Sequence, residues 1–495
     1  MIALVLVASI GTVHFVEQEI PGLQVGRVNP LTGGVTTNYR HADVDNDGAP
    51  DLVLPDSVWF QRESAYRPED RIPIPHAGDA PRCDLWQGQL FLWLPDRLIV
   101  VDWHDTGWRQ VMVQDLDWPG DHTPDTLPGA WGQGVCFHRF LEDLDEDGVP
   151  ELVAPSPEGI HVFAAQHNRY AETVCLDVLP PLSLAGMTRQ PLWPPEQRIV
   201  LLPTRQMTCR FFVDGRQVVV ISREPLSTDA VRFRTVSHIL SDTRPFNPLP
   251  GQQQEHLTAP LPAFVEPCRL NDDGRIDYAG GRWHVSAATM APAPVFETHV
   301  STDDGTSCDV FRARSFRPLC SFVDVNGDGR LDLVAESTGL FDGGARETLN
   351  RFVTSRRIDH EVRIHYQGLR GEFLESPEVC GRFVLTMEMV PAQNGDMFRR
   401  YQAGELVNIT GDFDGDGFRD AAVRDCANQL GLFLLRDGTF QAPAAGRLEI
   451  RPEWQFSVAD VDGDGRWDVV VHGVDRGDQE QPSQTKVFLT REGAG

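Results

Sequence analysis

The chain alternates short apolar runs with polar turns, and this pattern predicts strands rather than helices. Runs such as 52–54, 90–94, 98–101 and 469–471 are three to five residues long and rich in Val, Leu, Ile and Phe. Short runs of this kind, bounded by Gly, Asp, Asn or Pro, are typical of β-strands joined by tight turns. Residues 85–113 and 198–236 each hold four such runs, which predicts two four-stranded meanders. The sequence therefore predicts an all-β fold.

Five segments repeat one polar pattern, Asp-x-Asp/Asn-x-Asp-Gly-x-x-Asp/Glu, directly ahead of an apolar run. The pattern supplies side-chain oxygens at positions 1, 3, 5 and 9 and a Gly for the bend at position 6. Ca²⁺ takes roughly six to eight oxygen ligands in flexible geometry, so the pattern suits this ion. The simpler alternative is a set of Asp-Gly turns without metal, but such turns need no third and fourth acid. We therefore expect about five Ca²⁺ ions with these side-chain ligands: Asp43, Asp45, Asp47, Asp51, Asp143, Asp145, Asp147, Glu151, Asp324, Asn326, Asp328, Asp332, Asp412, Asp414, Asp416, Asp420, Asp460, Asp462, Asp464 and Asp468.

An EF-hand loop begins with the same residues, but the remainder of each segment excludes it. An EF-hand requires a bidentate Glu at position 12 and a helix on each side. Position 12 is instead occupied by Leu54, Ala154, Ala335, Val423 and Val471. The closing acid stands at position 9, and β-rich runs follow it.

The five loops and their flanking apolar runs resemble the FG-GAP/VCBS repeat of integrin-α N-terminal-like β-propellers. The resemblance implies that each loop lies in a four-stranded blade and that the backbone carbonyl of position 7 adds another Ca²⁺ ligand. A sixth copy, 269–277, has Arg269 at position 1. We expect this cation to fill the sixth loop in place of Ca²⁺.

Within that resemblance, the strand pattern predicts eight blades, beginning near residues 40, 83, 135, 197, 262, 318, 405 and 455, with seven as the alternative. Segments 64–82, 118–134 and 238–260 are interpreted as long loops, and 340–355 as an insertion with a short helix. The last blade lacks a fourth strand, whereas residues 12–18 form a strand-like segment without a blade. Because closure removes an open sheet edge, we expect residues 12–18 to lie outermost beside 486–489.

Charge and cysteine content narrow the classes of function. The net charge is −28 and there is no basic stripe, which argues against nucleic-acid binding. Nine cysteines without a Cys-x-x-Cys pair argue against zinc chemistry. Trp86, Trp93, Trp103, Trp108 and Trp118 gather in the second predicted blade; they are interpreted as packing between blades rather than as a sugar-binding surface.

The N-terminus is apolar and has two interpretations. Residues 1–11 are either a signal-peptide remnant or a first strand, and 12–495 is expected to form a single propeller domain. No other segment approaches the ~20 apolar residues of a membrane span. Extracellular calcium modules bind with Kd of about 10⁻⁴–10⁻³ M, far above cytosolic free calcium, so we expect an extracytoplasmic (secreted, periplasmic or cell-surface) location. We also expect the chain to be a monomer.

Two classes of function remain open. The favoured one is a non-enzymatic binding or adhesion scaffold for a protein or glycan partner. The alternative is a carbohydrate-active enzyme, a polysaccharide lyase or hydrolase, on a calcium-binding propeller. The sequence holds no nucleophile elbow, His-Glu-x-x-His motif or phosphate-binding loop, so no catalytic residue is assigned.

Overall fold

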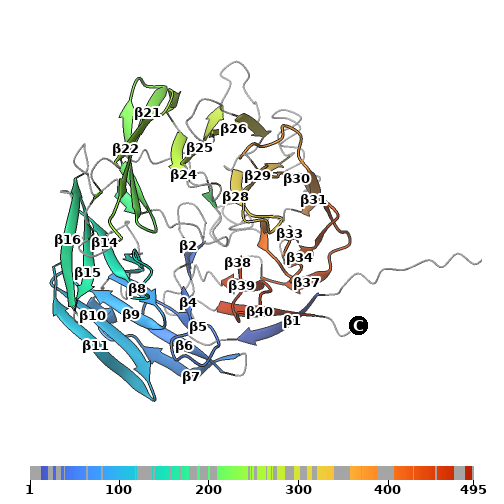
Figure 1. Cartoon of the computed structure of the whole chain (residues 1–495). Helices are drawn as coiled ribbons and strands as arrows, with labels where there is room; N and C mark the ends of the chain where they lie inside the picture. The colour runs from blue at the N-terminus through green and yellow to red at the C-terminus, as the bar shows by residue number, and fades with distance from the viewer. Residues whose placement is uncertain are drawn as a thin grey trace, which may run out of the picture.

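A computed structural model of the chain describes a series of segments that together trace a ring of sheets (Figure 1). The described residues are 13–19, 26–28, 35–37, 40–62, 65–79, 82–117, 119, 136–137, 140–156, 159–166, 169–177, 187–189, 199–200, 209–242, 246, 248–249, 253–263, 265–268, 270, 276–284, 295–301, 309–314, 320–338, 357–369, 371–386, 406–426, 428–451, 454–472 and 485–492.

The fold is an eight-bladed β-propeller, as the strand pattern predicts, and its blades are mostly four-stranded antiparallel sheets. The first four blades are formed by β4 (Arg40–Ala42), β5 (Asp51–Val53), β6 (Ser57–Arg62) and β7 (Ala65–Pro73); β8 (Arg82–Trp86), β9 (Gln89–Trp93), β10 (Arg97–His104) and β11 (Gly107–Asp115); β13 (Leu141–Glu142), β14 (Glu151–Pro155), β15 (Gly159–Gln166) and β16 (Arg169–Asp177); β19 (Cys209–Asp214), β20 (Gln217–Pro225), β21 (Ala230–Ile239) and β22 (Gln254–Leu257). The last four are formed by β24 (Val265–Cys268), β25 (Asp277–His284), β26 (Val295–Ser301) and β27 (Asp309–Arg314); β28 (Cys320–Val323), β29 (Asp332–Thr338), β30 (Arg357–His365) and β31 (Val379–Thr386); β32 (Val407–Gly411), β33 (Asp420–Cys426), β34 (Gln429–Phe433) and β37 (Gly446–Glu449); β38 (Gln455–Ala459), β39 (Asp468–His472), β40 (Thr485–Glu492) and β1 (Val13–Glu19).

Short elements supplement the blades. They are β2 (Gly26–Val28) paired with β3 (Val35–Thr37), the 3₁₀ turn η1 (Ala77–Asp79), β12 (Cys136–Phe137) parallel to β8, β17 (Met187–Arg189) parallel to β19, β18 (Ile199–Val200) beside β28, β23 (Leu261–Pro262) beside β21, and the hairpin of β35 (Leu435–Arg436) and β36 (Thr439–Phe440). Among the described residues, no helix is long and apolar enough to cross a membrane.

The ring closes by pairing its two chain ends, as expected from the missing fourth strand. β1 is the outermost strand of the eighth blade and runs antiparallel to β40, with Val13 opposite Glu492 and Glu19 opposite Lys486. The rings of Phe15 and Phe488 meet edge to face across this pair, with their centroids 6.5 Å apart. A strand from the start of the chain therefore pairs with the backbone N–H and C=O groups along the outer edge of β40.

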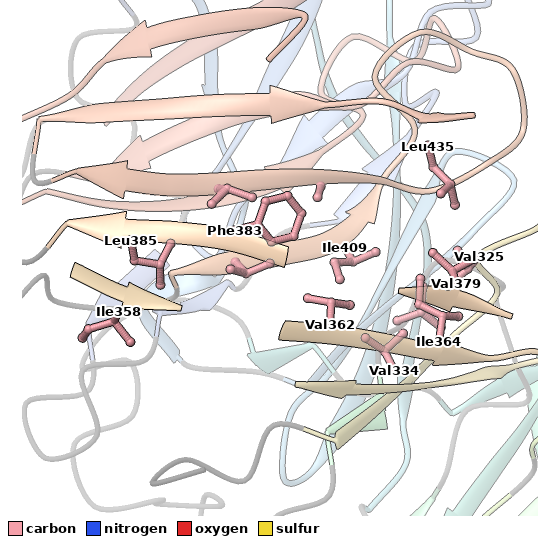
Figure 2. Packing of buried hydrophobic residues seen from close by; sticks show 14 residues of the cluster. Val325, Val334, Ile358, Val362, Ile364, Val379, Phe383, Leu385, Ile409 and Leu435 are labelled. Atoms are coloured by element: carbon pink, nitrogen blue, oxygen red, sulfur yellow. The ribbon is translucent and has the colours of Figure 1, made fainter. Parts of the chain in front are cut away.

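A separate apolar cluster fills each of the eight junctions between neighbouring blades in the described chain. Figure 2 shows the cluster between the sixth and seventh blades, where Val362 and Phe383 lie near Ile409. Buried strands of a blade present apolar side chains to both neighbours, which explains why their runs are continuous rather than alternating. The core is thus a ring of inter-blade contacts, and each blade is stabilised by its packing against the two neighbouring blades.

The tryptophans of the second blade pack between blades, as interpreted from the sequence. Trp93 is fully buried and meets the rings of Phe140 and Phe163 of the third blade edge-on. Trp103 lies 4.9 Å, centroid to centroid, from Phe60 of the first blade. Trp118 lies outside the described residues.

Three strand assignments were wrong, and two predictions could not be compared. The run at 198–202 is not the first strand of the fourth blade, because β18 pairs with β28 of the sixth. The segments 64–82 and 238–260 contain the outer strands β7 and β22 rather than loops only. Both strands are largely exposed and therefore polar, which removes the apolar signal. The expected loop 118–134, apart from residue 119, and the expected helix at 340–355 lie outside the described residues.

Candidate metal centres

Each acidic loop connects the first and second strands of its blade, so all five lie on the same face of the ring. The glycine at position 6 adopts a left-handed conformation, with φ of +89° at Gly48 and +92° at Gly417. Only glycine adopts such angles at little cost, which explains its place in the pattern. Position 4 is left-handed too, at Asn46 for example. Two left-handed residues turn the chain back on itself and point the acidic side chains inward.

The carboxylate at position 1 holds the bend from within. Asp43 Oδ1 accepts the N–H of Asp47 at 3.0 Å, and its Oδ2 accepts the N–H of Gly48 at 3.0 Å. The same two contacts recur at Asp143 and Asp324. These local hydrogen bonds shape the loop before any ligand binds.

The acid at position 9 has a structural role that its assignment as a ligand did not anticipate. Asp51 is fully buried; its Oδ2 accepts the N–H of Val44 at 2.8 Å and its Oδ1 accepts that of Gln61 at 3.0 Å. One side chain thus ties the loop to the third strand. Equivalent pairs of contacts form at Asp332, Asp420 and Asp468.

The degenerate sixth copy retains this structural acid. Asp277 is fully buried and accepts the N–H of Leu270 at 2.7 Å, as position 9 does elsewhere. Arg269 and residues 271–275 of that loop lie outside the described residues, so the absence of Ca²⁺ there stays a prediction. The retained Asp277 indicates that position 9 serves the blade independently of the first ligand.

Four of the five loops bring three acidic oxygens within 4.8 Å of one another. The groups are Asp43, Asp45 and Asp51; Asp143, Asp145 and Glu151; Asp412, Asp414 and Asp420; and Asp460, Asp462 and Asp464. In the remaining loop, on the sixth blade, Asn326 occupies position 3, and its Nδ2 donates a hydrogen bond to Asp328 Oδ2 at 3.0 Å. Its amide leaves only three acids in that loop, and we expect this loop to bind Ca²⁺ more weakly because affinity follows the number of charged ligands.

Several carboxylate oxygens in these clusters are buried without a hydrogen-bond donor among the described residues. They include Asp414 Oδ1, Asp460 Oδ1 and Asp462 Oδ1. Burying an anionic oxygen without a donor is costly unless a cation compensates. The side-chain atoms that could coordinate an ion in these clusters are all hard oxygens, which Ca²⁺ prefers. The residues therefore fit the ion that the loops imply.

Burial raises the pKa of several loop acids well above the usual range. It raises the pKa of Asp420 and of Asp468 to about 8, against the opposing effect of backbone N–H donors. It likewise raises the pKa of Asp51 and Asp332 to about 7. A bound cation would offset this desolvation and favour the ionised carboxylates.

Arginines at the end of the third strand, or just after it in the case of Arg436 on β35, contact the acids of three loops, and sequence reasoning missed them. Arg62, Arg436 and Arg491 each contact the acids at positions 3 and 5 of the loop in their own blade. Each directly follows the residue whose N–H donates to the position-9 acid. An arginine recurring at or just after the end of the third strand was the available signal.

Loops of successive blades are also hydrogen-bonded to each other. The N–H of Leu331, at position 8, donates to the carbonyl of Leu270 in the preceding blade at 2.9 Å. In the first blade, position 8 is Pro50, which has no N–H. The hydroxyl of Tyr66 there donates to the carbonyl of Val461 of the eighth blade at 2.7 Å. These contacts link the acidic loops across the blade junctions, including the junction that closes the ring.

Comparison with known proteins matches part of the chain to a repeat family. Residues 412–471 match the FG-GAP-like repeat, from the seventh-blade loop through β39 of the eighth blade. The chain is therefore a β-propeller that contains an FG-GAP-like repeat and several Asp-rich clusters. No curated protein matches the chain.

Two solved structures are similar only at low scores. Sqt1 from Saccharomyces cerevisiae is 9% identical, with a TM-score of 0.26, over 84% of this chain and 97% of that one. The endo-arabinase from Bacteroides thetaiotaomicron VPI-5482 is 9% identical, with a TM-score of 0.15, over 69% of this chain and 88% of that one. Neither similarity bears on the function of this chain.

Proposed function

We propose that the chain is a calcium-stabilised propeller that serves as a non-enzymatic binding or adhesion scaffold outside the cytoplasm. The observation that carries the calcium assignment is the group of buried, donorless oxygens Asp414 Oδ1, Asp460 Oδ1 and Asp462 Oδ1. Asp414 belongs to the seventh-blade loop and the other two to the eighth-blade loop, and one hard divalent cation in each loop would coordinate the oxygens there.

The scaffold role is supported by the contacts that hold the blades of the ring together. Its acidic loops are linked from blade to blade, and apolar clusters fill the blade junctions. Cations bound in these loops would tighten the frame from which the other loops project. Residues that bind partners are frequently carried by loops on such a rigid frame. Sites with the low affinity of extracellular calcium modules fill only where free calcium is abundant, which supports an extracytoplasmic location.

Calcium removal tests the first half of the proposal. A ligand that binds only the folded state stabilises it by about 2.7 kcal/mol per site at a hundredfold excess over Kd. We expect chelator to lower the melting temperature by more than about ten degrees, since several such sites rival a typical domain stability of ~5–15 kcal/mol. Calorimetry before and after chelation, with metal content measured, checks this. An unchanged melt after confirmed metal removal would exclude calcium as a stabilising ligand.

Ligand and activity screens test the second half. Arrays of glycans and extracellular proteins, probed with the calcium-loaded chain, are expected to show binding that chelator abolishes. Incubation with uronate polymers is expected to give no unsaturated products and no chain shortening. Turnover of any polymer would instead establish the carbohydrate-active alternative.

A further inference from the structure

A second cluster of metal-binding side chains lies on the third blade, at the opposite end from its acidic loop. The acidic loop ends where β14 begins, at Glu151, whereas Ser156 follows the last residue of that strand. His161 lies near the start of β15 and Cys175 near the end of β16. This end of the blade has no part in the calcium loops.

The sheet register brings the three donors to one face. His161 is directly opposite Cys175. A β-bulge after Val162 inserts one residue into β16, so that Phe163 is opposite Glu172. Without the bulge, Glu172 would point to the other face of the blade, because side chains alternate along a strand. The bulge therefore places Glu172 beside His161 and Cys175.

The imidazole of His161 is oriented by contacts at both nitrogens. Its Nδ1 lies 3.0 Å from Glu172 Oε1, and its Nε2 lies 2.7 Å from Ser156 Oγ and 3.7 Å from Cys175 Sγ. In the neutral imidazole, Nδ1 carries the proton because an ionised carboxylate only accepts hydrogen bonds, and Nε2 is left with its lone pair. A carboxylate on the remote nitrogen is the usual partner of a metal-binding histidine.

The site is held firmly and remains accessible. The His161 side chain is 10% exposed and its ring stacks on Phe163, with centroids 6.2 Å apart. The Glu172 side chain is 48% exposed, and Cys175 is half-buried. An ion can thus reach the thiol from solvent, while the imidazole keeps its position.

The donor chemistry differs from that of the calcium loops. Imidazole nitrogen and thiolate sulfur suit zinc and related divalent ions, whereas Ca²⁺ takes oxygen. Two tetrahedral ligands at ordinary Zn–N and Zn–S distances stand roughly 3.6 Å apart, close to the Nε2–Sγ distance here. A Ser-His-Glu hydrolase is the competing interpretation, but Ser156 is 1% exposed and no substrate can reach its hydroxyl.

We propose that His161 Nε2 and Cys175 Sγ bind a divalent cation of the zinc class on the third blade. Glu172 is the positioning residue that orients the imidazole, and solvent water completes the coordination. Binding replaces the hydrogen bond between Ser156 and His161, and the thiol proton is released to solvent. Candidate ligand atoms of all three residues lie within 4.8 Å of one another.

Cobalt substitution tests the proposal on the full chain. Co²⁺ is added to the reduced protein in excess Ca²⁺, which keeps the acidic loops filled. We expect one equivalent of a thiolate-to-cobalt charge-transfer band that Zn²⁺ displaces. Cys175→Ser and His161→Gln should abolish this band. Glu172→Gln should keep it but weaken Co²⁺ binding by about 10- to 100-fold, the usual effect of removing such a carboxylate.

Controls separate this site from the other thiols, since the chain has nine cysteines. Cys380→Ser, an exposed thiol on β31, should leave the band unchanged. Zn²⁺ should slow alkylation of Cys175 but not of Cys380 in the native protein, measured by peptide mass spectrometry. Each variant should keep the calcium-dependent melt of the parent. A band that survives in Cys175→Ser, or alkylation of Cys175 unaffected by Zn²⁺, would overturn the assignment.

Discussion

The backbone N–H of Arg419 donates to the carbonyl of Val325 at 2.8 Å and so joins the acidic loops of the sixth and seventh blades. The N–H of Trp467 likewise donates to the carbonyl of Asp412 at 2.7 Å, which joins the seventh loop to the eighth. Three neighbouring loops therefore share backbone contacts, and ordering of one loop by a cation supports the geometry of the next.

This linkage predicts coupling between neighbouring calcium sites. Asp324→Ala should empty the sixth-blade loop and weaken calcium binding in the Asp412 loop by about fivefold or more. Hydrogen exchange of a peptide spanning 412–420, measured across a calcium titration, reports this shift. Asp143→Ala, in the distant third blade, is the matched control and should leave that peptide unchanged. Equal effects of the two variants would show that the sites are independent.

Positions 3 and 9 of one loop should respond differently to substitution. Asp420→Ala leaves the buried N–H groups of Phe413 and Leu435 without their acceptor, at about 1–3 kcal/mol each. It should therefore destabilise the chain even in chelator. Asp414→Asn removes one of the crowded acids, so it should lower calcium affinity, and in chelator it should cost no more than the roughly 0.2–1 kcal/mol of its ion pair with Arg436. Denaturant unfolding with and without calcium separates the two outcomes; equal destabilisation in chelator would contradict the structural role of position 9.

The arginine at the eighth loop should compete with calcium. Arg491 Nη2 lies 2.5 Å from Asp462 and Nη1 lies 3.1 Å from Asp464. Arg491→Gln should raise calcium affinity several-fold and lower chelated stability by about 0.2–1 kcal/mol, the contribution of a partly exposed ion pair. Arg447→Gln breaks a pair with Asp425 outside the loops and serves as control. Calcium titration by calorimetry measures both variants, and a weaker site in Arg491→Gln would show that the guanidinium assists the ion.

Stability should depend on pH in opposite directions with and without calcium. Burial raises the pKa of Asp420 and Asp468 to about 8, above the unfolded value of about 3.9. Between these values the folded acid keeps a proton that the unfolded one has lost, so chelated stability should fall as pH rises from about 4 to about 8. Bound calcium favours the ionised acid, so calcium affinity should rise over the same range. Melting temperatures of metal-free and calcium-loaded protein across this range test both trends; parallel curves would contradict them.

The closure strand should matter most to the last blade. Deleting residues 1–20 removes β1 and exposes the edge of β40 and the ring of Phe488. We expect faster hydrogen exchange in 485–492 and weaker calcium binding at the Asp460 loop. Peptides from 357–386, in the sixth blade, provide the internal comparison. Equal loosening of both blades would indicate that closure stabilises the ring as a whole rather than its junction.

The sequence alone determined the features that depend on local spacing. Acids at positions 1, 3, 5 and 9 with a glycine at position 6 define one loop conformation, since the left-handed bend at Gly48 or Gly417 admits little else. Short apolar runs located most of the buried strands, because burial on both faces makes those runs continuous, although the run at 198–202 was assigned to the wrong blade. The unpaired segment at 12–18 identified the closing strand, because an open sheet edge needs a partner.

Only the tertiary structure decided which strands pair and which distant side chains come into contact. The outer strands β7 and β22 are polar, so only their pairing shows that they are strands. The dual contacts of Asp51 and the reach of Arg62 depend on how the third strand returns to the loop. Cysteine spacing argued against zinc, yet a single inserted residue in β16 brings Glu172 to the face that holds His161 and Cys175. Spacing along a chain fixes local turns, whereas pairing register and bulges arise from the packing of whole strands, and these place distant side chains within reach of one ion.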